Sequence, residues 1–387
     1  MEQIKTVEIK DICLGIYEGP HATPKNSDTG GIYLGIPALD PKGFIDYSRA
    51  KRIAEEDLPL WTKRVTPQED DIVFTNEATL NLYAIIPANF HGCLGRRLGL
   101  IRPNKDLVNV KYLFYYFFSP EWRETVAKNK VSGATVDRIL MTKFPSFPVS
   151  LPSLKTQERI ANILSVIDAK IEVNRQINDN LEQQAQALYK SWFVDFEPFK
   201  DQEFVESEFG LIPEGWHCTT LSELLSIKYG KDHKKLAEGI IPVYGSGGLM
   251  RYVDTKLHEG EAVLIPRKGS LNNVMYVNEA FWTVDTMFYS IPKQEYFCIY
   301  AYLFLANKDL ASMNAGSAVP SMTTDILNNM HIIAPHAEVL KRFNNICNVY
   351  FSRINQNNIE NANLSKQRDT LLPKLMSGEL KINEIDC

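Results

Sequence analysis

An internal duplication is the feature that most constrains the fold of this chain. Residues 133–192 align without a gap with residues 316–375, at an offset of 183 positions, and fourteen of the sixty aligned pairs are identical. The identical pairs include Pro152/Pro335 and Arg159/Arg342. A period this long is not that of a solenoid, whose repeats are far shorter. The sequence therefore predicts one large unit made twice, with the two copies related by a pseudo-twofold axis.

The duplicated segment predicts a long helix in each copy, because apolar residues recur every seven positions over more than four heptads. The seam positions of the first helix are Ile160, Leu164, Ile167, Ile171, Asn174, Asn178, Leu181, Ala185, Leu188 and Trp192. Those of the second are Phe343, Cys347, Tyr350, Ile354, Asn357, Asn361, Leu364, Arg368, Leu371 and Leu375. Only Arg368 fits such a seam poorly. A single stripe is also typical of an ordinary core helix, but two matched copies favour an antiparallel coiled-coil pair.

Both helices are expected to be long, with polar residues in mid-seam. Neither has Gly or Pro in its middle, so each should run until Pro198 or Pro373 intervenes. The residues from Ile160 to Trp192 would span roughly 48 Å. An Asn in a seam lowers stability but fixes register, and the candidates for this role are Asn174, Asn178, Asn357 and Asn361. We expect a spacer of defined length.

The segments that precede the helices predict two globular domains of mixed strand and helix, and hence an α+β chain. Expected strands in the first lie at residues 31–36, 71–74, 82–86 and 99–101, followed by helices over 110–118 and after Pro120. Expected strands in the second lie at residues 241–244, 262–266, 274–277 and 287–291, followed by a helix over 299–306. The order of elements matches although the residues mostly do not, as two domains that bind different targets would require.

These elements divide the chain into a first domain (residues 1–152), a first helix (153–198), a linker with the second domain (199–335), and a second helix with a tail (336–387). No signal peptide or apolar run of membrane-spanning length is present, so we expect a cytoplasmic protein with no membrane association. The six cysteines have neither metal-type spacing nor clustering. We expect them to be reduced thiols.

Sequence motifs for catalysis are missing. There is no phosphate-binding G-x-x-x-x-G-K-[ST], no dinucleotide-type G-x-G-x-x-G and no H-E-x-x-H. The seven histidines form no convincing triad or metal set, and no run of the kind that amino-methyltransferases use to hold a flipped base is found. The sequence argues against an active site or a metal site, and for a chain that binds and positions other molecules.

The charge of the chain does not by itself indicate DNA binding. Lys and Arg total 42 against 47 Asp and Glu, a net charge of −5, whereas a protein that neutralises many phosphates alone is usually basic. Local clusters nevertheless lie in expected turns, where long side chains can reach phosphates and base edges. The candidates are Arg96, Arg97, Lys231, Arg267, Lys268, Ser270, Asn272 and Asn273. Each cluster could equally be a solvated surface, and each Asn a turn residue.

Motifs along nearly the whole chain resemble the specificity subunit of type I restriction-modification enzymes. They are D-I-V-F-T-N-E-A (71–78), C-L-G-R-R-L (93–98), L-P-S-L-K-T-Q-E-R-I (151–160), I-P-E-G-W (212–216), I-P-R-K-G-S (265–270) and F-W-T-V-D-T (281–286). None is diagnostic alone, but their order together with the duplication is specific. The first of them adds Thr75 and Asn76 to the candidate DNA-binding residues.

The resemblance implies two target-recognition domains that read the halves of a split, double-stranded DNA sequence and are held apart by the paired helices. It also implies two methyltransferase subunits, which carry S-adenosylmethionine and methylate adenine, and restriction subunits that use ATP and Mg²⁺. This chain itself would bind no cofactor. Candidate docking residues at the helix starts are Gln157, Glu158, Arg159 and Arg342.

Two departures from the family pattern stand out. Arg96 occupies a position where the family often has Gln, and the second helix begins E-V-L-K-R-F (338–343) without the Gln–Glu pair of the first. A coiled-coil scaffold that binds only proteins stays open as an alternative. A self-contained nuclease or methyltransferase is disfavoured by the missing motifs.

Overall fold

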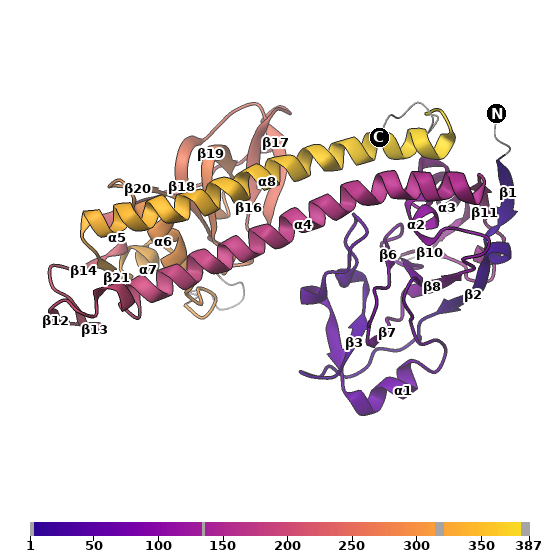
Figure 1. Ribbon diagram of the computed structural model, residues 1–387, viewed down its shortest axis with the longest axis horizontal. Helices are drawn as coiled ribbons and strands as arrows, with labels where there is room; N and C mark the ends of the chain where they lie inside the picture. Colours follow the sequence, from indigo (N-terminus) through magenta and orange to yellow (C-terminus); the bar gives the residue numbers. More distant parts are fainter. Residues whose placement is uncertain (1–3, 134–135, 314–320, 381–387) are drawn as a thin grey trace. The chain divides into compact units, whose positions relative to one another are not determined.

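The computed structural model describes residues 4–133, 136–313 and 321–380, and its contacts divide the chain into two units. Unit 1 comprises Met1–Val173 and Glu360–Cys387, and unit 2 comprises Asn174–Ile359 (Figure 1). Two long helices take part in both: α4 (Leu154–Phe193) and α8 (Ala337–Ser377). Each unit therefore combines a globular domain with one half of each helix.

Unit 1 places its strands in two main sheets, coloured indigo to violet in Figure 1. One sheet has the order β2-β8-β5-β6, and the other has the order β4-β3-β7. Their strands are β2 (Cys13–Glu18), β3 (Gly31–Leu34), β4 (Lys51–Ile53), β5 (Ile72–Thr75), β6 (Tyr83–Ile85), β7 (Gly92–Leu94) and β8 (Leu98–Pro103). The remaining elements are β1 (Lys5–Glu8), β9 (Lys130–Ser132), β10 (Asp137–Ile139), β11 (Pro148–Leu151), α1 (Leu58–Trp61), α2 (Val110–Tyr116) and α3 (Pro120–Asn129).

The main sheet of unit 2 has six strands in the order β15-β20-β18-β19-β16-β17, and β12-β13 and β14-β21 form two small sheets. Its strands are β15 (Leu225–Tyr229), β16 (Ile241–Gly245), β17 (Gly248–Val253), β18 (His258–Pro266), β19 (Met275–Thr283) and β20 (Met287–Pro292). The other elements are β12 (Phe204–Ser207), β13 (Gly210–Pro213), β14 (His217–Thr220), β21 (His331–Ala334), α5 (Leu221–Leu224), α6 (Phe297–Ala306) and α7 (Thr324–Asn328). Every strand and helix expected from the sequence is found, although β18 begins four residues earlier and β19 ends six residues later than expected.

The two units share one topology. β15, β20 and β18 of unit 2 correspond in order to β2, β8 and β5 of unit 1, and β16 and β17 correspond to β3 and β4. The long strand β19 corresponds to both β6 and β7. It pairs antiparallel with β18, as β6 pairs with β5. It also pairs parallel with β16, as β7 pairs with β3. The predicted duplication is thus confirmed at the level of the fold, and the pseudo-twofold axis stays a prediction.

The long helices pack in an antiparallel sense inside each unit. In unit 1 the start of α4, with Ile160 and Leu164, shares a core with Leu372 and Leu375 from the end of α8. In unit 2 the end of α4 packs on the start of α8, where the rings of Phe193 and Phe343 lie 4.8 Å apart. All twenty predicted seam positions are buried or half-buried. Coiled-coil packing over the full helix length stays a prediction.

Asparagines in the seam fix how α4 and α8 are aligned along each other within unit 2. Asn174 and Asn357 are fully buried there. The Asn357 amide donates to Asn178 Oδ1 at 2.8 Å, and the Asn178 amide donates to Asn358 Oδ1 at 2.9 Å. Because these bonds join α4 to α8, a slip of one helix along the other would break them. Asn361, the fourth candidate, lies half-buried in unit 1.

The expectation that Pro373 would end the second helix is wrong, since α8 continues to Ser377. A proline removes one backbone hydrogen bond and crowds the preceding turn. Pro373 stands in the last turns, flanked by Leu372, Leu375 and Met376, all buried in the core of unit 1. Burial of these side chains outweighs the loss of a single hydrogen bond. The first helix ends at Phe193, before Pro198.

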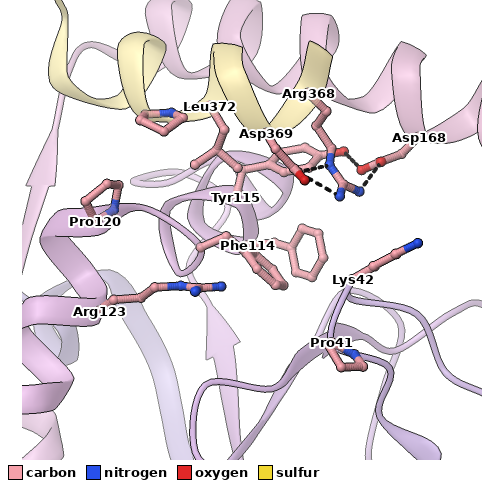
Figure 2. A pocket seen from close by; sticks show the side chains of 12 residues that line it. Pro41, Lys42, Phe114, Tyr115, Pro120, Arg123, Asp168, Arg368, Asp369 and Leu372 are labelled. Carbon is pink, nitrogen blue, oxygen red and sulfur yellow. Dashed lines mark hydrogen bonds and ion pairs between the residues drawn. The ribbon is translucent and has the colours of Figure 1, made fainter. Parts of the chain in front are cut away.

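The seam residue that fitted poorly, Arg368, is buried and forms the centre of an ionic network in unit 1 (Figure 2). Its guanidinium donates to Asp168 Oδ1 at 2.8 Å and to Asp369 Oδ1 at 2.9 Å. The hydroxyl of Tyr115 on α2 donates to the other Asp168 oxygen at 2.7 Å. The network lines a cavity of about 440 Å³ beside Phe114 and Arg123. It ties α4, α8 and the globular domain of unit 1 together.

Because Asp168 would keep its charge with only Tyr115 as a partner, we predict that Arg368→Met lowers the unfolding free energy by about 3 kcal/mol. Urea denaturation of the full chain measures this loss. The matched control is Lys170→Met, which removes an exposed α4–α8 pair whose Nζ lies 3.4 Å from Glu360. That control should cost less than about 1 kcal/mol. Equal losses in the two variants would contradict a special role for Arg368.

Candidate nucleic-acid interface

One edge of the sheets in unit 1 gathers most of the predicted DNA-binding residues of that half. We call edge 1 the ends of β2, β3 and β5 together with the turn Gly95–Arg97. Three backbone hydrogen bonds hold it: Gly19 N to Leu98 O at 2.8 Å, Gly95 N to Leu34 O at 2.7 Å, and Asn76 N to Arg97 O at 3.1 Å.

The same construction recurs in unit 2. We call edge 2 the ends of β15, β16 and β18 together with the turn Val284–Thr286. Its three equivalent bonds run from Gly230 N to Met287 O at 2.9 Å, from Val284 N to Tyr244 O at 3.1 Å, and from Arg267 N to Thr286 O at 2.9 Å. Edges 1 and 2 are therefore built by one hydrogen-bond pattern.

A fourth bond fixes the equivalence of the two edges residue by residue. Ile139 N donates to Asn76 O at 2.8 Å in unit 1, and Met322 N donates to Arg267 O at 2.9 Å in unit 2. Ile139 and Met322 stand 183 positions apart, the offset of the duplication. Asn76 of edge 1 is thus the structural counterpart of Arg267 of edge 2.

Each edge depends on a glycine where two backbone segments approach closely. A Cβ added to Gly19 would overlap the carbonyl oxygen of Gly95, and a Cβ added to Gly230 would overlap that of Val284. Any side chain at Gly19 or Gly230 would therefore push apart the strands that carry the candidate residues.

The candidates on edge 1 differ in accessibility. Arg96 is exposed, and the half-exposed Arg97 lies 3.2 Å from a carboxylate oxygen of Glu77. Thr75 and Asn76 are buried, at 1% and 4% exposure. The Thr75 hydroxyl accepts from the backbone of Leu82, and the Asn76 amide donates to Glu18. Thr75 and Asn76 therefore brace edge 1 from inside, whereas Arg96 is exposed and Arg97 is half-buried beside Glu77.

Edge 2 presents its cations differently. The guanidinium of Arg267 stacks over the ring of Tyr229 at 5.4 Å and donates to the carbonyl of Asp285 at 3.4 Å. Lys231, Lys268 and Ser270 are exposed. The stacking holds the Arg267 guanidinium against Tyr229, the last residue of β15.

The two asparagines of edge 2 are engaged within the protein. The amide of Asn272 donates to Asp309 at 3.0 Å, which lowers the pKa of that carboxyl, and its oxygen accepts from Ala311 N at 2.8 Å. The Asn273 amide donates to the carbonyl of Ser246 at 2.8 Å. Both residues act as loop braces here, in the turn role that was the alternative in the sequence.

Charge is exchanged between equivalent positions of the two edges. In edge 1 the turn carries Arg96 and Arg97 while the strand end carries Asn76 and Glu77; in edge 2 the turn carries Asp285 and Thr286 while the strand end carries Arg267 and Lys268. The sequence did not indicate Glu77 and Asp285 as candidate residues of the interface. The offset between equivalent edge residues is not 183, because the loops differ in length, so an ungapped alignment could not pair them.

The docking candidates at the helix starts also separate into buried and accessible residues. Gln157 is 1% exposed; its oxygen accepts from Asn109 N at 2.9 Å, and its amide donates to Pro152 O at 3.0 Å. It secures α2 to the start of α4. Glu158 and Arg159 are exposed, and exposed Arg342 lies 5.7 Å above the Trp192 ring.

Comparison with known proteins gives the family. Residues 1–183 and 213–364 match the model of the type I restriction modification DNA specificity domain. The chain belongs to this family. Its task is DNA recognition and not catalysis. No cluster of three or more potential metal ligands occurs among the residues described, and no helix in those residues is long and apolar enough to cross a membrane.

Individual relatives agree with this assignment. The chain is 27% identical over 385 residues to the type I restriction enzyme MjaIX specificity subunit of Methanocaldococcus jannaschii, covering 90% of this chain and 88% of that protein. It is 25% identical to the HindI specificity subunit of Haemophilus influenzae, covering 73% and 80%. The crystal structure of the S subunit from M. genitalium shares the fold with a TM-score of 0.57 at 17% identity, covering 97% and 96%.

Because edge 2 has no room for a side chain at Gly230, we predict that Gly230→Ala lowers the unfolding free energy by about 1–3 kcal/mol. Thermal unfolding followed by circular dichroism measures the change. Gly247→Ala is the matched control, since a Cβ there meets nothing within 4 Å. A Gly230→Ala protein as stable as this control would contradict the close approach.

Proposed function

We propose that this chain determines the DNA target of a type I restriction-modification enzyme, with edge 1 reading one half of a bipartite sequence and edge 2 the other. The observation that carries the proposal is the exchange of charge between structurally equivalent edges. One backbone scaffold presents Arg96 and Arg97 in one unit and Arg267 and Lys268 in the other. Two different half-sites require this combination of a common frame and divergent side chains.

The exposed edge residues would divide between base edges and phosphates. Arg is suited to the two acceptors of guanine in the major groove, and Lys and Ser to phosphate oxygens. We assign Arg96 and Arg267 to bases, because Arg96 is exposed and the Arg267 guanidinium is positioned by stacking on Tyr229. Lys231, Lys268 and Ser270 would contact the phosphates of the DNA backbone. Arg97 has part of its charge balanced by Glu77.

The helices would set the distance between the half-sites and receive the partner subunits. Two methyltransferase subunits carrying S-adenosylmethionine, and restriction subunits using ATP and Mg²⁺, would assemble on the chain. Glu158, Arg159 and Arg342 are suited to docking because they are exposed at the helix starts. With a net charge of −5, the chain needs partners to supply many of the phosphate contacts.

Co-expression with the cognate methyltransferase subunit in a methylation-free host, followed by genome-wide mapping of methyladenine, tests this function. A split motif that disappears when the chain is omitted is the expected result. A stable complex that methylates nothing, or methylates without sequence preference, would favour a protein-binding scaffold.

In the same assay, we predict that Arg267→Ala relaxes specificity at one half-site and Arg96→Ala at the other, each by about 1–3 kcal/mol. The matched control is Lys256→Ala, because Lys256 lies just before β18, at the end opposite Arg267. It should leave the motif unchanged. A uniform loss of methylation at all sites would instead make the two arginines phosphate contacts.

We also predict that inserting one heptad in the middle of both α4 and α8 lengthens the unread spacer and leaves both half-sites unaltered. Seven residues add about 10 Å of helix, close to the rise of about three base pairs. Insertion into only one helix should prevent stable folding, because the seams would no longer match. An unchanged spacer in the protein with both helices extended would refute the proposal that helix length sets the distance between the half-sites.

A further inference from the structure

We propose that Leu249 and Met250, at the tip of the β16–β17 hairpin, are specificity-determining residues of unit 2 that contact thymine methyl groups in the major groove. The inference rests on the proposed function and adds an apolar contact to the cations of edge 2. Both side chains are largely accessible, at 51% and 56% exposure.

The hairpin tip belongs to edge 2. Tyr244, near the end of β16, accepts a hydrogen bond from Val284 N, and Ser246 in the tip accepts from the Asn273 amide at 2.8 Å. Gly269 lies so close to Ser246 that an added Cβ would stand 2.7 Å from its hydroxyl oxygen. The tip is thus fastened to the loop that begins with Arg267 and Lys268.

A β-bulge sets the direction of the two apolar side chains. Val243 pairs with Arg251 while Tyr244 pairs with Leu249, so Met250 is an extra residue on β17. Such bulges re-aim side chains and increase local twist. Gly245 makes room for the result, since a Cβ there would stand 2.5 Å from the Met250 sulfur. The Met250 side chain thus lies over Gly245, and both Leu249 and Met250 stay more than half exposed.

The shape of the hairpin suits a nucleic-acid groove. A two-stranded β-ribbon fits the major groove of B-DNA. Three glycines, Gly245, Gly247 and Gly248, keep the tip narrow, and Cβ atoms at the last two would meet nothing within 4 Å. A slim ribbon with two apolar side chains at its end can approach the floor of a groove.

The charge around the tip selects DNA over a protein partner. Single exposed apolar residues are common on protein surfaces, but Leu249 and Met250 adjoin an edge bearing Lys231, Arg267 and Lys268 on a chain of net negative charge. A ligand that complements these cations and the two apolar side chains carries negative charge along its backbone and one apolar group in a recess. The thymine C5-methyl is the apolar group that the major groove presents. Since the proposed reaction modifies adenine, any half-site that is modified contains the thymine paired with that adenine.

Edge 1 provides an internal control. There β3 and β4 are joined by residues 35–50, a long connection in place of a tight glycine-rich turn. The methyl contact is therefore assigned to unit 2 alone, and thymines of the other half-site should lack it.

The test uses the complete methyltransferase complex and target duplexes in which individual thymines are replaced by uracil, which removes the methyl and keeps the base pair. Uracil in the half-site that Arg267→Ala relaxes should weaken binding about 3- to 5-fold, the effect of burying one methyl group. Uracil in the other half-site should not. The Leu249→Ala/Met250→Ala double variant should bind both duplexes equally.

Tyr252→Ala is the matched control, because Tyr252 is also on β17 and 46% exposed but lies farther from the tip. It should keep the preference for thymine. A double variant that still distinguishes thymine from uracil, or a wild-type complex indifferent to uracil in the unit 2 half-site, would overturn the inference. Specific binding with such indifference would leave the proposed function standing, whereas binding without any sequence preference would defeat the proposed function itself.

Discussion

The packing of α4 against α8 is the contact on which both units depend. Each globular domain is completed by helix segments from distant parts of the sequence: Leu164 and Leu375 lie in the core of unit 1, and Trp192 and Phe343 lie in that of unit 2. Both helices must therefore satisfy two cores at once. This constraint accounts for their nearly equal lengths, 40 and 41 residues. A change in the length of one helix has to be matched in the other.

In both edges the backbone builds the shared structure, and the side chains supply the differences. Their shared hydrogen bonds join backbone atoms, which nearly every residue type supplies, and the glycines at 19, 95 and 230 are fixed by lack of space. Side chains at the exposed edge positions can then diverge without cost to the fold. This freedom explains how Asn76 and Arg267 occupy equivalent places. Backbone-built sites with variable side chains are well suited to domains that must acquire new targets.

The sequence predicted what periodicity and local propensity control. The long helices, their seams and the main strands follow from spacing, and two copies strengthened each inference. Tertiary contacts decided the rest. Pro373 stays helical because its neighbours are buried. Thr75 and Gln157 turn inward to bond backbone groups, and Asn76 to bond the Glu18 carboxylate, partners that the sequence does not reveal. The equivalence of the edges was hidden because their loops differ in length, so the spatial pairing had to be seen before the residues could be aligned.

The acidic balance of the chain becomes intelligible under the proposed function. Phosphate contacts give affinity for any DNA sequence, whereas base contacts discriminate. Edges with few accessible cations, such as the exposed Arg96 and Lys268 and the half-buried Arg267, would contribute discrimination with little sequence-independent affinity. Affinity would then come from the methyltransferase subunits, so that the chain binds DNA firmly only after assembly. A free specificity subunit would then not occupy target sites that it cannot modify. The weak attraction between this chain and DNA phosphates would therefore favour binding by the assembled complex as well as selectivity among sequences.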